Sequence, residues 1–507
     1  MNTRIRRLAA FLMALYVILF AALNYWQVGH SDELAVQPGN TRAIIRQFDQ
    51  PRGPIITADG VTVAESVLTT EPGSDVTYQR HYPTGDLFAN IVGYYTFGLG
   101  STQLERTRDK VLTGSTFTQQ VHHLNNLLST ETDNSGELHL TLRADLQRTA
   151  RDLLGDREGS IVLLEPDTGA IRAMWSWPSY DPNVVASPDY DEAYDYVTEL
   201  QDDPRDPLLA NTYQQRYTPG STFKVITAGA GLDAGVITLE SEWESLDSWT
   251  PPQTTRPITN YGGKACGGDL TEVFAQSCNI PFGQIALELG ADQFVDYVSR
   301  WSIGEPIPID LPRPASSTLG DITDLDQQLP LLAMRGFGQN EIQMVPLHLA
   351  LVAATVANDG EMMTPYVVDS ERDHKGRVLS TTQPSRWRQP ITRRTANILT
   401  EMMRAVAESG TASCCIGLDG GISVAAKTGT AELTGTDDDR SHAWIIAFAP
   451  VEDPQYAVAV LVKGTADSPP NMTGGRTAGP IAKAMLDAAL ATDRSTEPPS
   501  PDTGGDE

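Results

Sequence analysis

The chain has 507 residues, of which 40% are hydrophobic and 20% are charged, a composition typical of a globular protein with room for two or three domains. Its 65 acidic residues outnumber its 37 lysines and arginines and give a formal net charge of −28. Binding to nucleic acid would require a basic patch, so this charge excludes a nucleic-acid partner. We interpret the acidity as a solvated surface.

The N-terminus carries a long apolar segment. Three arginines in the first seven residues precede an uncharged run over residues 8–23, and Tyr25 and Trp26 follow it. With its aromatic end, the run approaches the ~20 residues that cross a bilayer. A cleaved signal peptide is the alternative, but no clear small-x-small cleavage site follows. We expect a cytoplasmic N-terminus at residues 1–7, a single-pass anchor in the cytoplasmic membrane at residues 8–26, and the rest outside that membrane.

Residues 28–150 are expected to form a non-catalytic module that is irregular and rich in β-structure. Short strand-like stretches occur near residues 43–56 and 61–66. Residues 82–112, which contain many glycines and aromatic residues, favour a scaffold. A helix predicted over residues 143–154 leads into the next domain.

Residues 155–491 are predicted to form a mixed domain. Two apolar runs surround a turn within residues 160–175, and residues 442–450 and 456–462 form a second strand pair. Helical patterns lie between and after them, at residues 223–232, 270–289, 393–409 and 478–490. Hairpins at both ends with helices between them predict an α+β fold, with an antiparallel sheet covered by helices. Residues 493–507, rich in Pro, Thr, Gly and acids, are predicted to be a disordered tail.

A serine and a lysine three positions apart carry the first chemical signal. Ser221 and Lys224 follow a turn at residues 218–220 and would share one face of a helix. A serine hydroxyl becomes a useful nucleophile when a base lies within hydrogen-bond reach. A lysine can be that base if burial or a neighbouring cation lowers its pKa. The pair therefore predicts acyl transfer through a serine.

Two further short motifs fall in the same domain. Ser-Cys-Asn occupies residues 277–279, and Lys-Thr-Gly-Thr occupies residues 427–430, within a strand predicted over residues 422–433. In that strand Lys427 and Gly429 share one side, and Gly429 leaves room for a substrate backbone. Each motif alone is usually an ordinary helix cap, loop or strand end. Their order within one domain-sized segment favours a functional site.

Together the three motifs resemble the S-x-x-K, S-x-N and K-T-G set of the penicillin-binding proteins and serine β-lactamases. Further stretches extend the resemblance to the class B penicillin-binding proteins, which are monofunctional transpeptidases, from about residue 52 to about residue 490. These stretches are Arg-Gly-Pro-Ile-Ile at 52–56 with Asp-Gly at 59–60, residues 217–225, Gly-Phe-Gly-Gln at 336–339 and His-Ala-Trp at 442–444.

The resemblance implies catalytic roles for the motif residues. Ser221 would attack the substrate carbonyl after losing its proton to Lys224. Ser277 would relay a proton from a lysine to the leaving group, and Lys427 would add a second cation to the pocket. The backbone amides of Ser221 and Thr430 would form the oxyanion hole.

The resemblance also implies how substrate is held. Asn279 would bind an amide of the acyl donor. Lys427, Thr428 and Thr430 would bind its terminal carboxylate, along a strand that a substrate peptide joins and that Gly429 keeps open. No cofactor is implied.

The implied function is a peptidoglycan D,D-transpeptidase of cell-wall synthesis. Such an enzyme cross-links stem peptides through a serine acyl-enzyme, is acylated by β-lactam antibiotics, and works with a SEDS-type membrane glycosyltransferase. A D,D-carboxypeptidase or β-lactamase would use the same motifs with water as the acceptor. A penicillin-sensing receptor would be acylated without transferring the acyl group, and a non-catalytic scaffold would not need all three motifs.

Four cysteines lie in the part expected outside the membrane, where disulfides can form. Cys266 and Cys278 are a plausible local pair, although four cysteines allow three connectivities. The neighbours Cys414 and Cys415 are not expected to pair with each other, because their bond would be strained. No Cys-x-x-Cys or His-Glu-x-x-His occurs, so no metal site is predicted. His442 is expected to be structural or pocket-lining.

Overall fold

The structure, a computed structural model, describes residues 2–25, 48–69, 77–116, 119, 135–433 and 440–496. Most of the predicted tail lies outside these residues, as does the stretch 28–47 of the expected N-terminal module. Residues 493–496 belong to the last helix, α17 (Gly479–Thr496).

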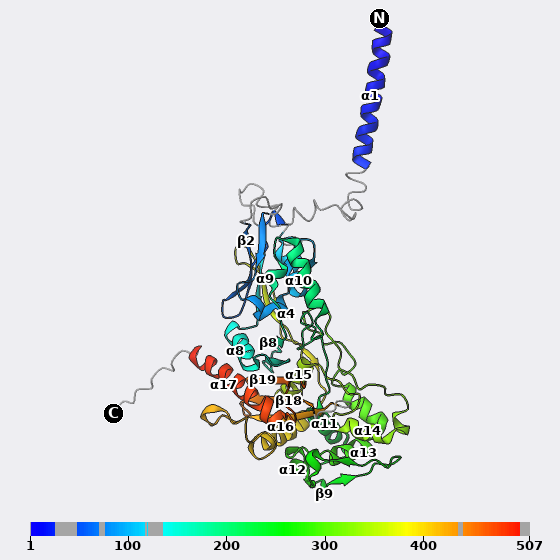
Figure 1. Ribbon diagram of the computed structural model, residues 1–507, viewed down its shortest axis with the longest axis vertical. Coiled ribbons are helices and arrows are strands. Elements are labelled where there is room, and N and C mark those ends of the chain that lie inside the picture. Colours follow the sequence, from blue (N-terminus) through cyan, green and yellow to red (C-terminus); the bar gives the residue numbers. More distant parts are fainter. Residues whose placement is uncertain are drawn as a thin grey trace, which may run out of the picture. The chain divides into compact units, whose positions relative to one another are not determined.

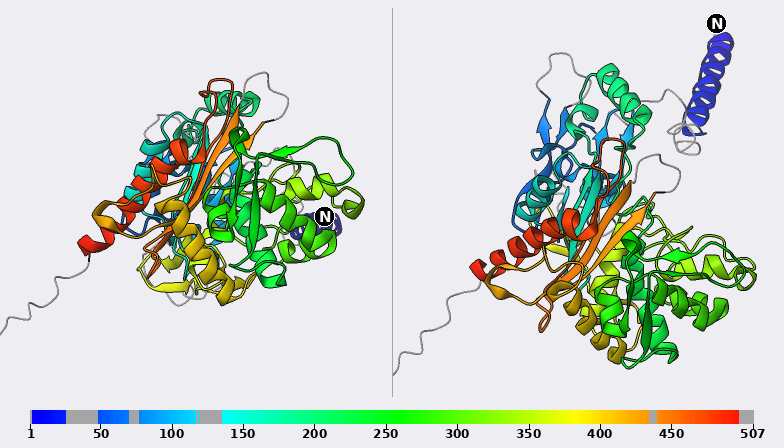
Figure 2. Two further views of the ribbon diagram at one scale, coloured as in Figure 1. Left: turned by 90° about the horizontal axis from the view of Figure 1, so that it is seen from below. Right: turned by 60° about the horizontal axis from the view of Figure 1, so that its bottom comes forward.

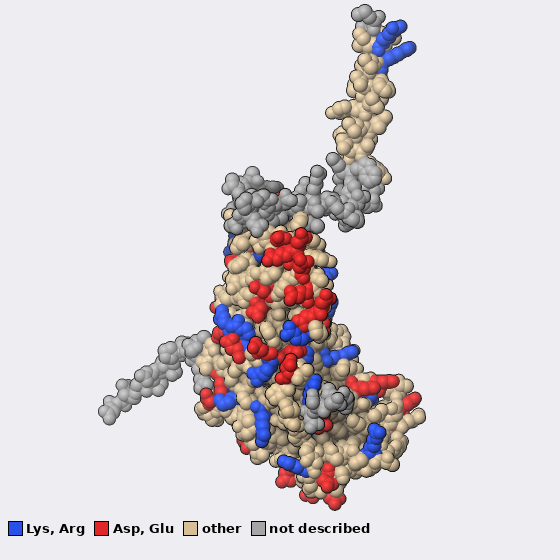
Figure 3. Space-filling model, in the orientation of Figure 1, with Lys and Arg blue, Asp and Glu red and all other residues tan. Residues whose placement is uncertain are grey.

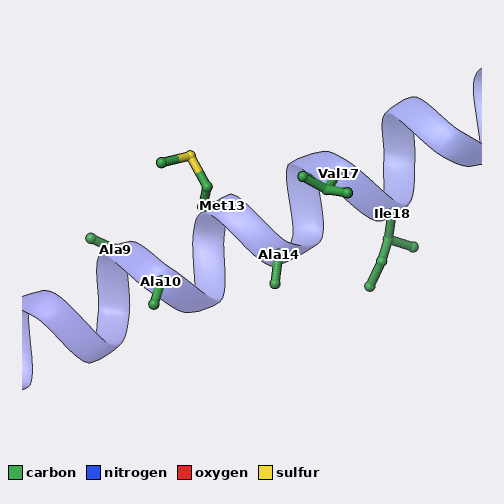
Figure 4. A pocket seen from close by; sticks show the side chains of 6 residues that line it. All are labelled: Ala9, Ala10, Met13, Ala14, Val17 and Ile18. Atoms are coloured by element: carbon green, nitrogen blue, oxygen red, sulfur yellow. The ribbon is translucent and has the colours of Figure 1, made fainter.

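The helix α1 (Asn2–Asn24) contains the one segment in the described part of the chain that is long and apolar enough to cross a membrane. Over Thr3–Asn24 its mean hydropathy is 1.9, and none of that span is buried. Figure 4 shows small and medium-sized apolar side chains along it, those of Ala9, Ala10, Met13, Ala14, Val17 and Ile18. This surface offers no group for chemistry, and α1 fits the predicted single membrane anchor.

The domain that carries the three motifs is built on a five-stranded sheet. Its strands, in spatial order, are β17 (Ala425–Glu432), β18 (Ser441–Ala449), β19 (Tyr456–Val462), β7 (Gly159–Leu164) and β8 (Ile171–Trp177). Every neighbouring pair is antiparallel. The three central strands are buried along their whole length, and they consist mainly of apolar residues because both faces of the sheet are covered.

Helices form a layer on each side of this sheet (Figures 1 and 2). On one side α8 (Ala144–Leu154) and α17 pack against it. On the other side α15 (Pro346–Ala357) lies on the central strands and contacts α16 (Arg393–Glu408), which in turn packs against α11 (Lys224–Ala234). Because α15 is enclosed by the sheet and these helices, it is apolar around nearly its whole circumference. The predicted α+β fold, with helices covering an antiparallel sheet, is confirmed by this arrangement.

Residues 270–289 have a helical pattern, but they do not form one continuous helix. The segment forms two helices, α12 (Leu270–Ala275) and α13 (Ile280–Ser299), and the Ser-Cys-Asn motif lies in the break between them. Ser277 has a φ of 59°, in the left-handed region, which ends the first helix. Pro281 has no N–H to donate and so belongs in the first turn of a helix, where α13 has it.

A second sheet has six strands. Its order is β15 (Val378–Thr381), β14 (Val368–Asp373), β6 (Gly136–Leu140), β1 (Ile55–Ile56), β2 (Thr62–Leu68) and β3 (Tyr78–His81). The pair β1 and β6 is parallel, whereas β14 is antiparallel to both of its neighbours. Strands β14 and β15 belong to the range 155–491, whereas the other four strands belong to the expected N-terminal module. The hydrogen bonds between β14 and β6 therefore join the two expected domains.

A cluster of buried charges supports this second sheet. Glu105, in α5 (Gln103–Thr107), accepts from Arg52 Nε and Arg80 Nε at 2.6 Å each, and all three side chains are almost completely buried. Burial alone would raise the pKa of Glu105, but the two guanidinium groups outweigh it and lower that pKa. Beside Arg52, a Cβ on Gly53 would lie 1.8 Å from the carbonyl oxygen of Gly136, so only glycine fits there.

Acidic side chains gather over α10 (Tyr190–Asp202) on the face in Figure 3, in agreement with a solvated acidic surface. The other short elements are α4 (Ala89–Val92), β4 (Tyr95–Thr96), β5 (Gly100–Ser101), α6 (Asp109–Leu112), α9 (Pro182–Val185), α14 (Leu329–Gly336), β13 (Met362–Met363) and β16 (Arg386–Arg388).

Candidate active site

A groove with a volume of about 1520 Å³ brings the three motifs together. Its lining includes Ser221, Ser277, Asn279, Thr428 and Thr430. Pockets for small molecules usually measure ~300–1,000 Å³. The groove is larger than these, and it suits an extended chain better than a single small ligand.

Ser221 lies in a tight turn that opens onto this groove. The turn is the 3₁₀ helix η3 (Gly220–Phe223), which runs directly into α11. Gly220 has a φ of 54°, a conformation that favours glycine, and its N–H donates to the carbonyl oxygen of Gly338 at 3.1 Å. A Cβ on Gly338 would lie 2.1 Å from the oxygen of Gly220. The Gly-Phe-Gly-Gln stretch therefore supports the turn that presents Ser221.

Lys224, at the start of α11, is completely buried behind the turn. Its Nζ donates to the carbonyl oxygen of Ser277 at 2.7 Å and to Asn279 Oδ1 at 2.8 Å, and Ser277 Oγ lies 3.3 Å away. Among the described residues, the Ser221 hydroxyl is not one of its hydrogen-bond partners. Catalytic hydrogen bonds often tighten only when substrate binds.

Lys427 approaches Ser277 from another element. It lies in β17 and is completely buried, and its Nζ donates to Ser277 Oγ at 2.9 Å. The hydroxyl of Ser277 thus lies between the amines of Lys224 and Lys427. Two lysines and a bridging hydroxyl form a path along which a proton can move.

The pKa of each lysine is lowered in this site. Burial, and secondly the neighbouring Lys427, lower the pKa of Lys224 well below its ordinary value of 10.5. Burial lowers the pKa of Lys427 to about 7. Within the described residues, neither amine forms an ion pair with a carboxylate. The environment therefore favours a neutral Lys224, the form that can accept a proton.

The Lys-Thr-Gly motif forms the edge strand β17, which packs tightly on the turn before Ser221. A Cβ on Gly429 would lie 2.7 Å from the carbonyl oxygen of Pro219 and 3.1 Å from Trp444 Cβ. Here the close neighbours of Gly429 belong to the chain itself rather than to a substrate. Trp444 Nε1 donates to the carbonyl oxygen of Thr218 at 3.0 Å and holds that turn against the sheet.

Residues outside the three motifs fix the side chains of this strand. Thr411 Oγ1 and Thr428 Oγ1 share a hydrogen bond of 2.6 Å. Gly474 N, in η7 (Gly474–Ala478), donates to Thr430 Oγ1 at 3.4 Å. No local sequence pattern marks Thr411 or Gly474, because both act through tertiary contact.

All four cysteines are in disulfides. Cys266, in β12 (Cys266–Asp269), is bonded to Cys278 of the Ser-Cys-Asn motif. The expectation that Cys414 and Cys415 do not pair is wrong, since these neighbours are bonded to each other. They meet in the turn that follows α16, where no regular helix or strand directs the two side chains apart.

His442 is buried and its Nδ1 accepts from Gly464 N at 3.0 Å. Burial, with Lys463, lowers the pKa of His442 to about 4, so the ring is neutral and structural. Within the described ranges, no group of three His, Cys, Asp or Glu residues is placed to hold a metal ion.

A serine on a helix start beside a buried pair of lysines, next to the edge of a helix-covered sheet, defines a serine acyl-transfer site. The family model described as the penicillin binding protein transpeptidase domain matches residues 159–487. A second, the penicillin binding protein A dimerisation domain, matches residues 52–138. The chain therefore belongs to the penicillin-binding protein transpeptidase family.

Named relatives and solved structures support the same family assignment. The chain is 39% identical to the peptidoglycan D,D-transpeptidase PbpA of Mycolicibacterium smegmatis, over 97% of this chain and 99% of that one. The enzyme of the same name from Mycobacterium tuberculosis is 36% identical, with the same coverage. The ceftriaxone acyl-enzyme complex of penicillin-binding protein A from M. tuberculosis matches with a TM-score of 0.81 and 34% identity, and covers 88% of this chain and 100% of that one. The resemblance to class B penicillin-binding proteins, and to penicillin-binding protein A in particular, is confirmed.

Proposed function

We propose that this chain is a membrane-anchored peptidoglycan D,D-transpeptidase that joins stem peptides through an acyl-enzyme on Ser221. The observation that carries the proposal is the pair of buried lysines, bridged by Ser277, beside the groove that Ser221 lines. The similarity to enzymes named D,D-transpeptidases supports the same reaction, and the acyl-enzyme structure of a relative supports acylation by β-lactams.

The first half-reaction makes the acyl-enzyme. The Ser221 hydroxyl gives its proton to neutral Lys224, and Oγ forms a bond to the carbonyl carbon of the penultimate D-Ala of the donor peptide. Backbone amides of Ser221 and Thr430 stabilise the oxyanion. The C–N bond then breaks, and the proton reaches the departing D-Ala amine through Ser277 and the two lysines.

The second half-reaction transfers the acyl group. An amine of a neighbouring stem peptide attacks the ester carbon, a new C–N bond forms, and the bond to Ser221 Oγ breaks. The proton lost by the amine returns to Oγ through Lys224. The enzyme ends as it began, with a cross-link made and D-Ala released.

Substrate binding uses the groove and the edge strand. Lys427, Thr428 and Thr430 bind the terminal carboxylate of the donor, which extends along β17 as an added strand beside Gly429. Asn279 holds an amide of the donor. Its Oδ1 already accepts from Lys224 and its Nδ2 donates to the carbonyl oxygen of Thr259, yet an amide side chain keeps one further acceptor and one further donor site.

We place the parts of the chain as the sequence suggests. Residues 1–7 are cytoplasmic, residues 8–26 span the cytoplasmic membrane, residues 28–150 form the N-terminal module, and residues 155–491 form the transpeptidase domain outside the membrane. Disulfides persist in oxidising compartments, so the two in this domain support an extracytoplasmic location. A SEDS-type glycosyltransferase is the proposed membrane partner, and it would supply the glycan strands.

Acylation by penicillin tests the proposal directly. The full chain in detergent, incubated with penicillin G, should gain the mass of one penicilloyl group, and peptide mapping should place it on Ser221. Ser221→Ala should gain no mass. An adduct on another residue, or the same adduct on Ser221→Ala, would overturn the proposal. Donor and acceptor peptides then separate transfer from hydrolysis, because a transpeptidase gives a cross-linked product and a carboxypeptidase only a shortened donor.

A further inference from the structure

One wall of the groove comes from the long connection between α11 and α12. It contains the strand pair β10 (Ser248–Trp249) and β11 (Ile258–Thr259), and the pair of β9 (Glu242–Leu246) with β12. Many groove-lining residues belong to this connection. None of the three sequence motifs falls within it.

Asn260, directly after β11, lies where this wall meets the Ser-Cys-Asn motif. Asn260 is only 5% exposed, and its side chain makes four hydrogen bonds to backbone groups. Oδ1 accepts from Asn279 N at 2.8 Å and from Ile280 N at 3.2 Å. Nδ2 donates to the carbonyl oxygens of Leu246 at 2.8 Å and Lys264 at 3.1 Å. The amide oxygen of Asn260 therefore holds the backbone of the Ser-Cys-Asn motif and the start of α13, and its amide nitrogen holds the backbone of the groove wall.

The start of α13 explains why an outside side chain is needed there. The first N–H groups of a helix have no partner within it, and an asparagine at the N-cap normally satisfies one of them with its own side chain. Asn279 is the N-cap residue of α13, but its side chain makes no cap hydrogen bond. That side chain is directed instead to Lys224 Nζ and to the carbonyl oxygen of Thr259. Asn260 instead accepts from the N–H groups of Asn279 and Ile280, the N-cap and first residue of α13, from outside the helix.

We infer that Asn260 is a positioning residue for the proposed transpeptidase: by accepting from the N–H groups of Asn279 and Ile280, it fixes the backbone from which the Asn279 side chain reaches Lys224. The chain of contacts runs from Asn260 to Asn279, from Asn279 to Lys224, and from Lys224 to Ser277. Without Asn260, the N–H groups of Asn279 and Ile280 lose their acceptor, and the start of α13 can shift. Lys224 then loses a partner that fixes its amine behind Ser221.

The nearby disulfide does not replace this role. The bond between Cys266 and Cys278 ties the wall to the motif. It supplies no acceptor for the N–H groups of Asn279 and Ile280, and it does not direct the Asn279 side chain. The two links are therefore independent, and Asn260 can be tested with the disulfide intact.

The test compares two variants of the full-length, oxidised protein in detergent with a matched control. Asn260→Ala removes all four hydrogen bonds, whereas Asn260→Asp keeps the two acceptor bonds and loses the two donors. Asn183→Ala is the control, because Asn183 in α9 also bridges backbone groups, those of Tyr82, and does not line the groove. Stopped-flow labelling with a fluorescent penicillin, over a range of concentrations and pH, separates non-covalent binding from the acylation rate constant.

We expect Asn260→Ala to acylate roughly 10- to 100-fold more slowly, as misplacement of a catalytic group does, with little change in non-covalent affinity. Asn260→Asp should keep most of the rate at high pH, but its pH midpoint should rise, because a carboxylate near Lys224 favours the charged amine. Lys224 otherwise faces the Lys427 amine and the ring of Phe282. The control should acylate as the wild type does, and a purely structural Asn260 would lower the stability of Asn260→Ala without slowing acylation of its folded fraction.

The outcomes decide between roles. A normal acylation rate in Asn260→Ala, or an equal loss in Asn183→Ala, overturns the inference. If Asn260→Ala does not fold, the acylation rate constant of Asn260→Asp at high pH decides alone, and a large loss there, with both acceptor bonds kept, overturns the inference. If the wild type itself forms no adduct on Ser221, the proposed function fails first, which distinguishes the two failures.

Discussion

Two regions of this molecule bury charged groups in opposite ways. In the N-terminal cluster, the Glu105 carboxylate is enclosed with two guanidinium groups, and Arg52 also reaches Asp109. Behind the groove, Lys224 and Lys427 are buried just as completely, but their hydrogen bonds go to a hydroxyl, an amide and carbonyl oxygens. The first region compensates buried charge, whereas the second leaves it uncompensated.

The two environments shift pKa values with opposite results. Opposite charges keep Glu105 ionised in spite of its burial, so it serves as a fixed support for the second sheet. With no carboxylate beside them, the lysines lose protons more easily than free lysine does. Burial of a paired charge therefore indicates structure, and burial of like charges without counterions indicates chemistry.

Lys224→Ala should have the largest effect, because Ser221 loses its base. Acylation by penicillin should slow by about 10²–10⁴-fold, the range of general-base contributions, while the protein stays folded by circular dichroism. Lys375→Ala, which removes an exposed lysine in the turn between β14 and β15, is the control and should acylate normally. A normal rate in Lys224→Ala would assign the base elsewhere.

Glu105→Ala should act on stability instead. Removing one partner of a buried cluster leaves uncompensated guanidinium groups, so we expect a loss of about 3–5 kcal/mol in the free energy of unfolding. Because its folded pKa is lowered, the stability contributed by Glu105 is present above the ordinary pKa of 4.5 and is lost as the pH falls through the folded value.

Chemical denaturation measures the stability change, with Glu65→Ala at a half-exposed carboxylate as the control. The folded fraction of Glu105→Ala should acylate as the wild type does. A large drop in its acylation rate would show that the two regions are coupled and would contradict their separate roles.

Lys427→Ala should have a smaller effect than the two variants above, and it should change two quantities, the KM for the donor and the pH midpoint of acylation. The donor loses a cation for its terminal carboxylate, so its KM should rise by roughly tenfold, as loss of a charge-assisted hydrogen bond implies. Lys224 also loses the like charge that lowers its pKa, so the pH midpoint of acylation should move upward. Steady-state kinetics with a peptide donor and labelling over a pH series measure the two effects. An unchanged KM together with an unchanged midpoint would contradict this assignment.

The sequence predicts the α+β fold and brings out three motifs that the fold collects in one groove. Short motifs such as Ser-x-x-Lys can be found because their spacing reflects local geometry, one helical turn or one strand. The break at residues 276–279 had a local signal too, since Pro281 fits only the first turn of a helix. The segments on both sides of the break have helical periodicity, so the pattern of residues 270–289 alone did not reveal it.

Other features had no local signal. Strands β14 and β15 join the second sheet across more than 200 residues of sequence, as the pairing of Val368 with Leu140 shows. Asn260 is one asparagine among loop residues, and its role depends on a helix end that folding brings to it. Such pairings are decided by tertiary packing, which composition and periodicity do not encode.

The pH dependence of Ser221 acylation tests the central claim most directly, namely that an uncompensated, buried Lys224 is a neutral base. The acylation rate constant of the wild type with penicillin should be measured from pH 4 to pH 10. The claim predicts a rate that rises with pH to a plateau, with a midpoint well below 10.5, the ordinary pKa of lysine. A rate that keeps rising through pH 10 would show that Lys224 is charged at neutral pH, and would contradict the account.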